Sequence, residues 1–156
     1  MKLFFLFLLA LLTINLTNAS LNLDKGKMEY SLKIGEESCQ IVSLTSDDYE
    51  GTIKVRDVWA ENQNEDENLN KYTFFASNHK ITIKYIDTIL DFNDRIDFEV
   101  CLTADKSGGF KGALIFTPDA KTNVVVEIGT WLIVNVEETT LINPISSGES
   151  RSGSGD

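Results

Sequence analysis

The chain has little of the chemistry that most catalytic and metal centres use. It contains one histidine, His79, and two cysteines, Cys39 and Cys101. Zinc and copper sites take most of their ligands from histidine and cysteine, so this composition excludes an ordinary site of either kind. A serine–histidine–aspartate site holds its base in a pocket, and no G-x-S-x-G motif accompanies His79. The position of His79 beside Asn78, where a turn is predicted, favours a surface histidine.

Positive charge is also scarce. The chain has 14 lysine and arginine residues against 24 aspartate and glutamate residues, and its formal net charge is −10. An acidic surface repels phosphate backbones, which argues against nucleic acid as a partner. The same repulsion argues against anionic membranes. The charge favours solubility, and it does not identify a partner.

A long apolar run occurs only near the start of the chain. Lys2 is followed by the unbroken apolar segment Leu3 to Leu12, and a polar stretch then ends in Thr17-Asn18-Ala19. Spanning a bilayer takes about 20 apolar residues, so this run is too short for a membrane helix. A basic start, a short apolar core and small residues at Thr17 and Ala19 predict a secretory signal peptide over residues 1–19.

The rest of the chain lacks the features of a membrane anchor. Its last residues are small or charged, whereas a GPI signal requires a hydrophobic tail. We expect one folded domain over residues 20–142 and a flexible polar tail over residues 143–156, which begins at Asn143-Pro144. The protein is therefore predicted to be secreted, extracellular and free of a membrane anchor.

Two cysteines in an oxidising compartment predict one disulfide, between Cys39 and Cys101. Both residues lie in apolar alternating runs, as a bridge between two strands or between two sheets requires. Closing so long a loop stabilises the folded state by restricting the unfolded chain. Two buried free thiols, or an intermolecular bond, remain the alternative.

Apolar and polar residues alternate with a period of two along most of the chain. Met28, Tyr30 and Leu32 alternate with charged or polar neighbours, and similar runs surround Ile53–Trp59 and Ile96–Leu102. This alternation is typical of half-buried antiparallel strands. Segments rich in glycine, asparagine and aspartate separate the runs at short intervals. The pattern predicts an all-β fold, an antiparallel β-sandwich of about eight strands that is immunoglobulin-like or similar.

The order Cys39, Trp59, Cys101 resembles the cysteine–tryptophan–cysteine order of immunoglobulin-type domains. The chain departs from that family at two points. Trp59 comes later after the first cysteine than is usual there, and Glu99 stands where the corner tyrosine would be. The resemblance implies a sandwich.

A second stretch, Ile34 to Val55 together with Phe98-Glu99-Val100-Cys101, is similar to the GOLD lumenal domain of early-secretory-pathway cargo receptors. That resemblance also implies a small sandwich closed by a disulfide. The coiled coil, membrane span and cytosolic tail that follow the domain in those receptors do not follow here. Their receptor function is therefore not carried over.

Oxygen-rich turns are the candidates for metal binding. Calcium takes oxygen ligands, and loops at one end of a sandwich can converge on it. Asp91, Asn93 and Asp94 are weak calcium candidates on this ground, although their spacing does not match an EF-hand loop. The alternative is a set of solvated loops that keep the protein soluble.

The two tryptophans have different predicted places. Trp59 shares its face with Ile53 and Val55, which predicts a core position. If Leu132, Val134 and Val136 point inward, a second set of side chains points outward, and an exposed tryptophan among them offers a stacking surface for a sugar or an anchor for a protein. A strand buried on both faces is the alternative. The predicted ligand-binding residues are Trp131, Ile133 and Asn135.

No catalytic residue and no cofactor is assigned. These observations favour a secreted, non-catalytic binding or structural module that recognises an extracellular glycan or matrix component. A calcium-dependent adhesion or protein–protein interaction module is one alternative. Another is a small secreted hydrolase or hydrolase inhibitor, in which His79 or a pair of carboxylates would act.

Overall fold

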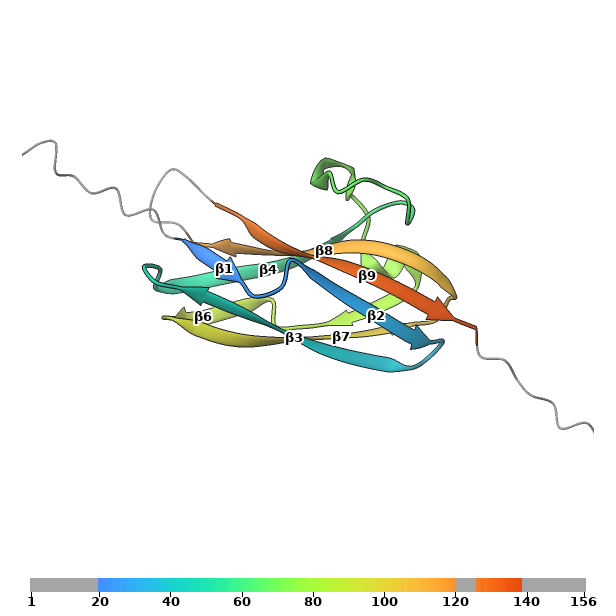
Figure 1. Ribbon diagram of the computed structural model, residues 1–156, viewed down its shortest axis with the longest axis horizontal. Coiled ribbons are helices and arrows are strands. Elements are labelled where there is room, and N and C mark those ends of the chain that lie inside the picture. Colours follow the sequence, from blue (N-terminus) through green and yellow to red (C-terminus); the bar gives the residue numbers. More distant parts are fainter. Residues whose placement is uncertain (1–19, 120–125, 139–156) are drawn as a thin grey trace, which may run out of the picture.

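The computed structural model describes residues 20–119 and 126–138, which are coloured in Figure 1. The predicted signal peptide and tail lie outside these residues. Within the described residues, no helix is long and apolar enough to cross a membrane. The elements follow in the order β1 (Leu21–Leu23), β2 (Lys27–Lys33), β3 (Glu37–Ser46), β4 (Gly51–Trp59), η1 (Leu69–Lys71), η2 (Ala76–His79), β5 (Ile81–Lys84), β6 (Thr88–Phe92), β7 (Arg95–Ala104), β8 (Gly108–Pro118) and β9 (Ile128–Glu137), where η marks a short 3-10 helix.

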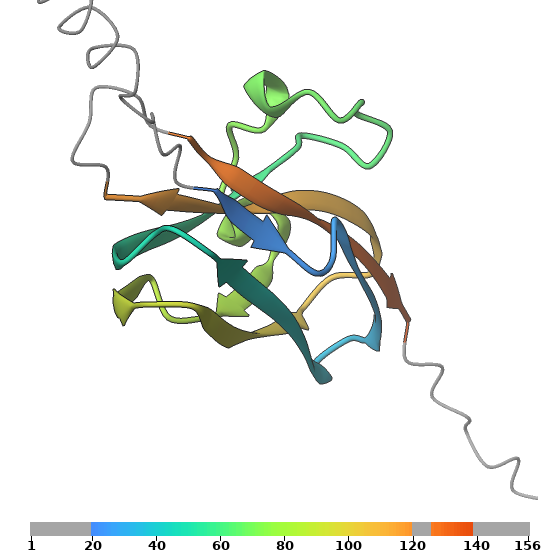
Figure 2. The same cartoon turned by 60° about the vertical axis from the view of Figure 1, so that its left-hand side comes forward.

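The strands form two sheets that pack face to face (Figure 2). Sheet A has the order β1-β3-β7-β5, and sheet B has the order β2-β9-β8-β4-β6. The described neighbours pair antiparallel except β2 and β9, which run parallel. This pair arises because the chain moves from sheet A to sheet B between β1 and β2 and arrives beside the last strand. The predicted β-sandwich is confirmed, with a parallel pair that the sequence pattern did not indicate.

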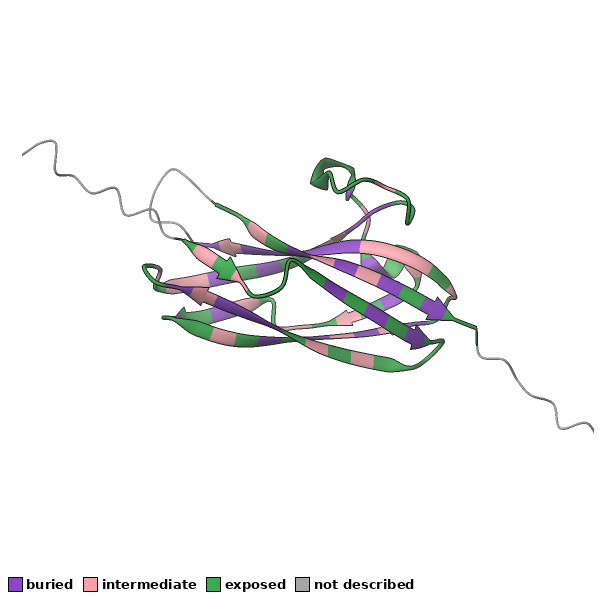
Figure 3. Cartoon of the chain, in the orientation of Figure 1, coloured by how far each residue is buried: buried purple, intermediate pink, exposed green. Residues whose placement is uncertain are grey.

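The core lies between the sheets and follows the predicted alternation. Figure 3 shows buried and exposed residues alternating along β2, where Met28, Tyr30 and Leu32 are buried. Trp59 at the end of β4 is fully buried, as its shared face with Ile53 predicts. Burying a large apolar side chain stabilises the fold by about 1.5–3 kcal/mol. The period-two pattern therefore identifies these core residues.

Tyr30 links the two sheets through a buried hydrogen bond. Its hydroxyl group donates to the Val100 carbonyl oxygen on β7, at 3.0 Å. Burial raises the pKa of Tyr30 well above its usual value, because the phenolate would lose its hydration. Burial also raises the pKa of Tyr85, whose hydroxyl donates to Asp57 at 2.6 Å.

We expect these tyrosines to destabilise the fold at high pH. The unfolded chain releases their protons near pH 10, whereas the folded chain keeps them. Their contribution is therefore complete below pH 10 and is lost as the pH rises further, by about 1.4 kcal/mol per pH unit for the buried Tyr30 and by less for the partly exposed Tyr85. Urea unfolding between pH 8 and pH 11 measures the slope. Tyr30→Phe should make the fall shallower, and an unchanged slope in this variant would contradict the assignment.

The predicted disulfide is confirmed, and its place is specific. Cys39 on β3 and Cys101 on β7 are direct partners in the register of sheet A, with their Cα atoms 4.0 Å apart. Cys101 points away from the core because Val100 and Leu102 point into it. The bridge therefore lies on the outer face of sheet A, where Cys39 is exposed. It joins neighbouring strands and does not join the two sheets.

Between β4 and β5 the chain leaves the sandwich in an excursion, residues 60–75, that includes η1. Figure 1 shows it standing above the side of sheet B that carries β8 and β9. The Lys111 ammonium group on β8 donates to the Glu65 carbonyl oxygen at 3.0 Å, and Tyr72 is buried. Lys71 forms an ion pair with Glu65 at 2.7 Å within the excursion. The excursion is therefore folded back against the sheet.

Candidate functional site

The predicted ligand-binding residues Trp131, Ile133 and Asn135 all point to the outer face of sheet B, as the alternation predicts. Asn135 is exposed, whereas Trp131 and Ile133 are half-buried. The ring of Tyr72 packs against Trp131 with the ring centroids 5.2 Å apart. Trp131 is therefore one half of a packed aromatic pair, and ligand binding at Trp131, Ile133 and Asn135 stays a prediction. The sequence pattern missed this contact because Tyr72 comes from the distant excursion.

The predicted calcium residues surround the turn between β6 and β7. Asp91 has a positive φ of 53° at an irregularity in the pairing of β6 with β4, and the Asp94 carbonyl oxygen accepts a hydrogen bond from Ser46 N–H at 2.8 Å. Neither carboxylate belongs to a group of three metal-ligand side chains among the described residues. Calcium binding at Asp91, Asn93 and Asp94 stays a prediction.

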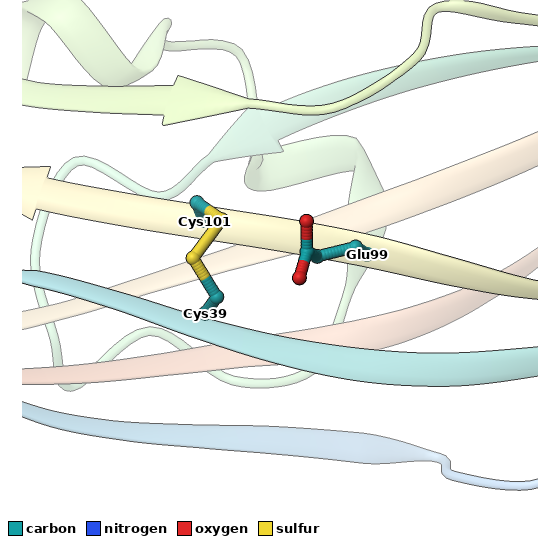
Figure 4. A group of neighbouring side chains, drawn as sticks. All are labelled: Cys39, Glu99 and Cys101. Atoms are coloured by element: carbon teal, nitrogen blue, oxygen red, sulfur yellow. A yellow bond between two sulfur atoms is a disulfide. The ribbon is translucent and has the colours of Figure 1, made fainter.

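One group of three ligand-type side chains does occur in the described residues. The ligand atoms of Cys39, Glu99 and Cys101 lie within 4.8 Å of one another on the outer face of sheet A (Figure 4). Metals bind cysteine as the thiolate, and both sulfur atoms here are held in the disulfide. The oxidised protein therefore does not offer a metal centre at this point.

His79 lies deeper than the sequence pattern indicated. The imidazole is half-buried at the end of η2, among the rings of Trp59, Phe74 and Phe110 at centroid distances of 6.3, 6.0 and 5.5 Å. Its Nε2 atom is buried and has no hydrogen-bond partner. No carboxylate of the described residues hydrogen-bonds the ring, so the orienting contact of a serine–histidine–aspartate site is not formed there.

A pocket of about 270 Å³ opens beside His79. It lies between the start of the excursion, the end of η2 and the turn from β7 to β8. We call it the His79 pocket. Aromatic and polar groups both line it, so it can accept a small amphipathic molecule. Its lining residues are Ala60, Glu61, Asn62, Gln63, His79, Lys106, Ser107, Gly108, Gly109 and Phe110.

Strand β3 has an edge that is only partly covered. Its residues Glu37–Thr45 pair with β7, but on the other side β1 pairs with Leu44–Ser46 alone. Asp24 extends this cover by one position. Its N–H donates to the Ser43 carbonyl oxygen at 3.1 Å, and its carboxylate accepts a hydrogen bond from the Ser43 N–H at 2.7 Å. Residues 37–41 are left without a neighbouring strand. We call them the open edge of β3.

Two hydrogen bonds show which backbone groups the open edge presents. Ser46 N–H donates to Asp94 on the β7 side, whereas Ser43 bonds Asp24 on the β1 side. Backbone groups alternate along a strand, so the odd-numbered residues point their N–H and C=O away from β7. The Lys25 ammonium group covers the Ile41 carbonyl oxygen at 2.6 Å. Among the described residues, the Ile41 N–H and both backbone groups of Cys39 have no partner.

The side chains of the open edge add an apolar surface. Ile41 is 49% exposed on the outer face of sheet A and follows the disulfide along the strand. Glu37 at the far end forms an ion pair with Lys84 at 2.5 Å. The open edge thus combines unpaired backbone groups with an exposed aliphatic side chain.

The other described sheet edges are better protected against pairing. Edge strands are usually protected against pairing with another strand by lysine side chains, by short length or by bulges. Strand β2 presents Lys27 and Lys33 at its two ends, β5 has four residues and ends in Lys84, and β6 carries the irregularity at Asp91. Residues 37–41 contain no lysine, proline or bulge. The open edge of β3 is therefore the least protected edge of the described sandwich.

Comparison with known proteins identifies the fold. No protein-family model matches the sequence, and no curated protein matches it. Solved structures do match: a PapD-like domain of human CEP192 has a TM-score of 0.55 at 8% identity, covering 76% of this chain and 86% of that one. The fold is a β-sandwich similar to that of this PapD-like domain. At this level of identity the likeness shows the fold alone.

Two further matches concern other kinds of protein. The class 5 fimbriae chaperone CfaA has a TM-score of 0.53 at 9% identity, and the match covers 76% of this chain and 57% of the chaperone. A family 123 glycoside hydrolase from Clostridium perfringens has a TM-score of 0.53 at 9% identity, covering 79% of this chain and 28% of the hydrolase. The matched region is thus little more than half of the chaperone and a minor part of the hydrolase.

Proposed function

We propose that this chain is a secreted, non-catalytic module that binds an extended segment of a partner protein at the open edge of β3. The unpaired backbone groups of Cys39 and Ile41 carry the proposal. An added strand would pair with them, so that main-chain hydrogen bonds supply affinity and alternate side chains supply specificity. The signal-peptide pattern and the disulfide support secretion. The matched chaperone supports a protein partner by analogy of fold only.

The surroundings of the open edge indicate the chemistry of the partner segment. Ile41 favours an aliphatic or aromatic residue directly beside it. Glu99 is the register partner of Ile41 on β7, and the whole chain carries a net charge of −10. Basic residues alternating with the apolar one would complement this charge. We therefore expect a segment with alternating apolar and basic residues.

Ile41→Pro is expected to abolish this binding without unfolding the protein. The Ile41 N–H points away from β7, so proline removes an edge donor and no ladder hydrogen bond. Linear peptides selected from a random phage-displayed library on the tag-free protein provide the probe. We expect enriched sequences with alternating basic and apolar residues, and at least a tenfold loss of affinity in the variant.

Two matched variants control for other causes. Thr88→Pro is placed on β6, at the edge of sheet B opposite β2, where Val55 N–H bonds the Asp87 carbonyl oxygen and the Thr88 N–H therefore points away from β4. It should bind the selected peptides as the unmodified protein does. Ile41→Thr keeps the edge N–H and should lose less affinity than Ile41→Pro. Undiminished binding by a folded Ile41→Pro protein, or equal loss in Thr88→Pro, would refute strand addition at β3.

A further inference from the structure

The His79 pocket contains two opposite charges that are not neutralised within it. Glu61 stands on the wall made by the excursion, and Lys106 stands on the wall made by the turn from β7 to β8. Neither side chain forms an ion pair or a hydrogen bond among the described residues, and they do not pair with each other. Both residues are exposed, so each charge is solvated and accessible to a ligand.

The pocket also offers an apolar surface and limited space. The rings of Phe110 and His79 pack together at 5.5 Å, and the buried Trp59 supports His79 from the core. Rings held in this way provide a fixed contact surface for an apolar group. A volume of about 270 Å³ falls below the range of roughly 300–1,000 Å³ that drug-sized ligands occupy. The ligand must therefore be small.

We infer that the His79 pocket binds a small zwitterion, a free amino acid with an apolar or aromatic side chain. The Glu61 carboxylate would accept hydrogen bonds from the α-ammonium group, and the Lys106 ammonium group would donate to the α-carboxylate. The side chain would lie against Phe110 and His79. A ligand with a single charge would gain only one of these two contacts, so it should bind more weakly than the zwitterion.

Glycine at position 109 shapes one wall of the pocket. A Cβ atom at Gly109 would collide with the side-chain oxygen of Gln63. The side-chain amide of Gln63 therefore lies directly against the backbone of Gly109. Gly109→Ala would push Gln63 into the pocket or out of it. This variant therefore changes the shape of the site while both charges stay in place.

Titration with free phenylalanine tests the inference. His79 is the single histidine of the chain, so the ring-proton NMR signals of the tag-free protein report on this pocket without ambiguity. We expect a saturable shift of these signals with phenylalanine, and at least tenfold weaker binding of N-acetylphenylalanine and of phenylalanine amide. Glycine, which lacks the apolar group, should also bind at least tenfold more weakly.

Charge-matched variants assign the two contacts. Glu61→Gln should weaken the binding of phenylalanine and leave that of N-acetylphenylalanine unchanged, because the latter has no ammonium group. Lys106→Met should weaken the binding of phenylalanine and leave the binding of phenylalanine amide unchanged, because the amide has no carboxylate. Lys54→Met, on an exposed position of β4, is the control and should bind normally. No saturable shift with phenylalanine, or equal binding of all three compounds, would overturn the inference.

Discussion

Trp59→Ala is expected to lower the free energy of unfolding by about 3–5 kcal/mol. The indole is fully buried, and it fills the space left by Gly112, where an added Cβ atom would lie 2.9 Å from the ring. Its Nε1–H donates to the Asp57 carboxylate at 2.6 Å. The variant therefore loses packing and a charge-assisted hydrogen bond together. Urea unfolding followed by far-UV circular dichroism measures the loss.

Trp59→Phe separates the two contributions. It keeps a ring in the core and removes the N–H, while Tyr85 still donates to Asp57. We expect a loss clearly smaller than that of Trp59→Ala. Gly112→Ala is the matched change on the facing strand and should destabilise as well, because the added methyl group meets the indole. A loss below about 1 kcal/mol for Trp59→Ala would contradict the assigned core role.

Removal of the disulfide by the double substitution Cys39→Ser and Cys101→Ser is expected to cost about 4 kcal/mol. The bridge joins residues 62 positions apart, and the loss follows from the additional freedom of the unfolded chain. Cys39 is exposed on the outer face of sheet A, so serine there buries no new polar group. Urea midpoints of the variant and the unmodified protein give the difference.

The alanine pair Cys39→Ala and Cys101→Ala is the control for side-chain chemistry. It should lose about the same stability as the serine pair, because both variants open the same loop. Unequal losses would show that the introduced hydroxyl or methyl groups contribute in addition to the opened loop. A loss below about 1 kcal/mol in both pairs would show that the unfolded chain is already restricted in this region.

Much of the fold could be predicted from local pattern. Alternation identified the strands, assigned Met28, Tyr30 and Trp59 to the core, and placed Trp131 and Asn135 on the outer face. These predictions succeed because side chains alternate from face to face in any strand, whatever its neighbours are. The disulfide also followed from composition, since two cysteines allow a single intramolecular pair.

The candidate sites could not be predicted in the same way. Tyr72 covers Trp131 from another part of the chain, and His79 stands among three rings that the chain order does not bring together. The open edge of β3 exists because a three-residue strand, β1, lies beside a ten-residue one. No period or motif in the sequence indicates which strands become neighbours.

The sequence by itself therefore determined the all-β class, the core residues, the acidic surface and the identity of the disulfide partners, because each depends on composition or on local alternation. The tertiary structure alone decided three things: the parallel pairing of β2 with β9, the part of β3 that stays uncovered, and the meeting of Glu61, His79 and Lys106 around one pocket. Each depends on contacts between distant segments. Such contacts are set by packing and pairing over the whole chain, and a local pattern carries no record of them.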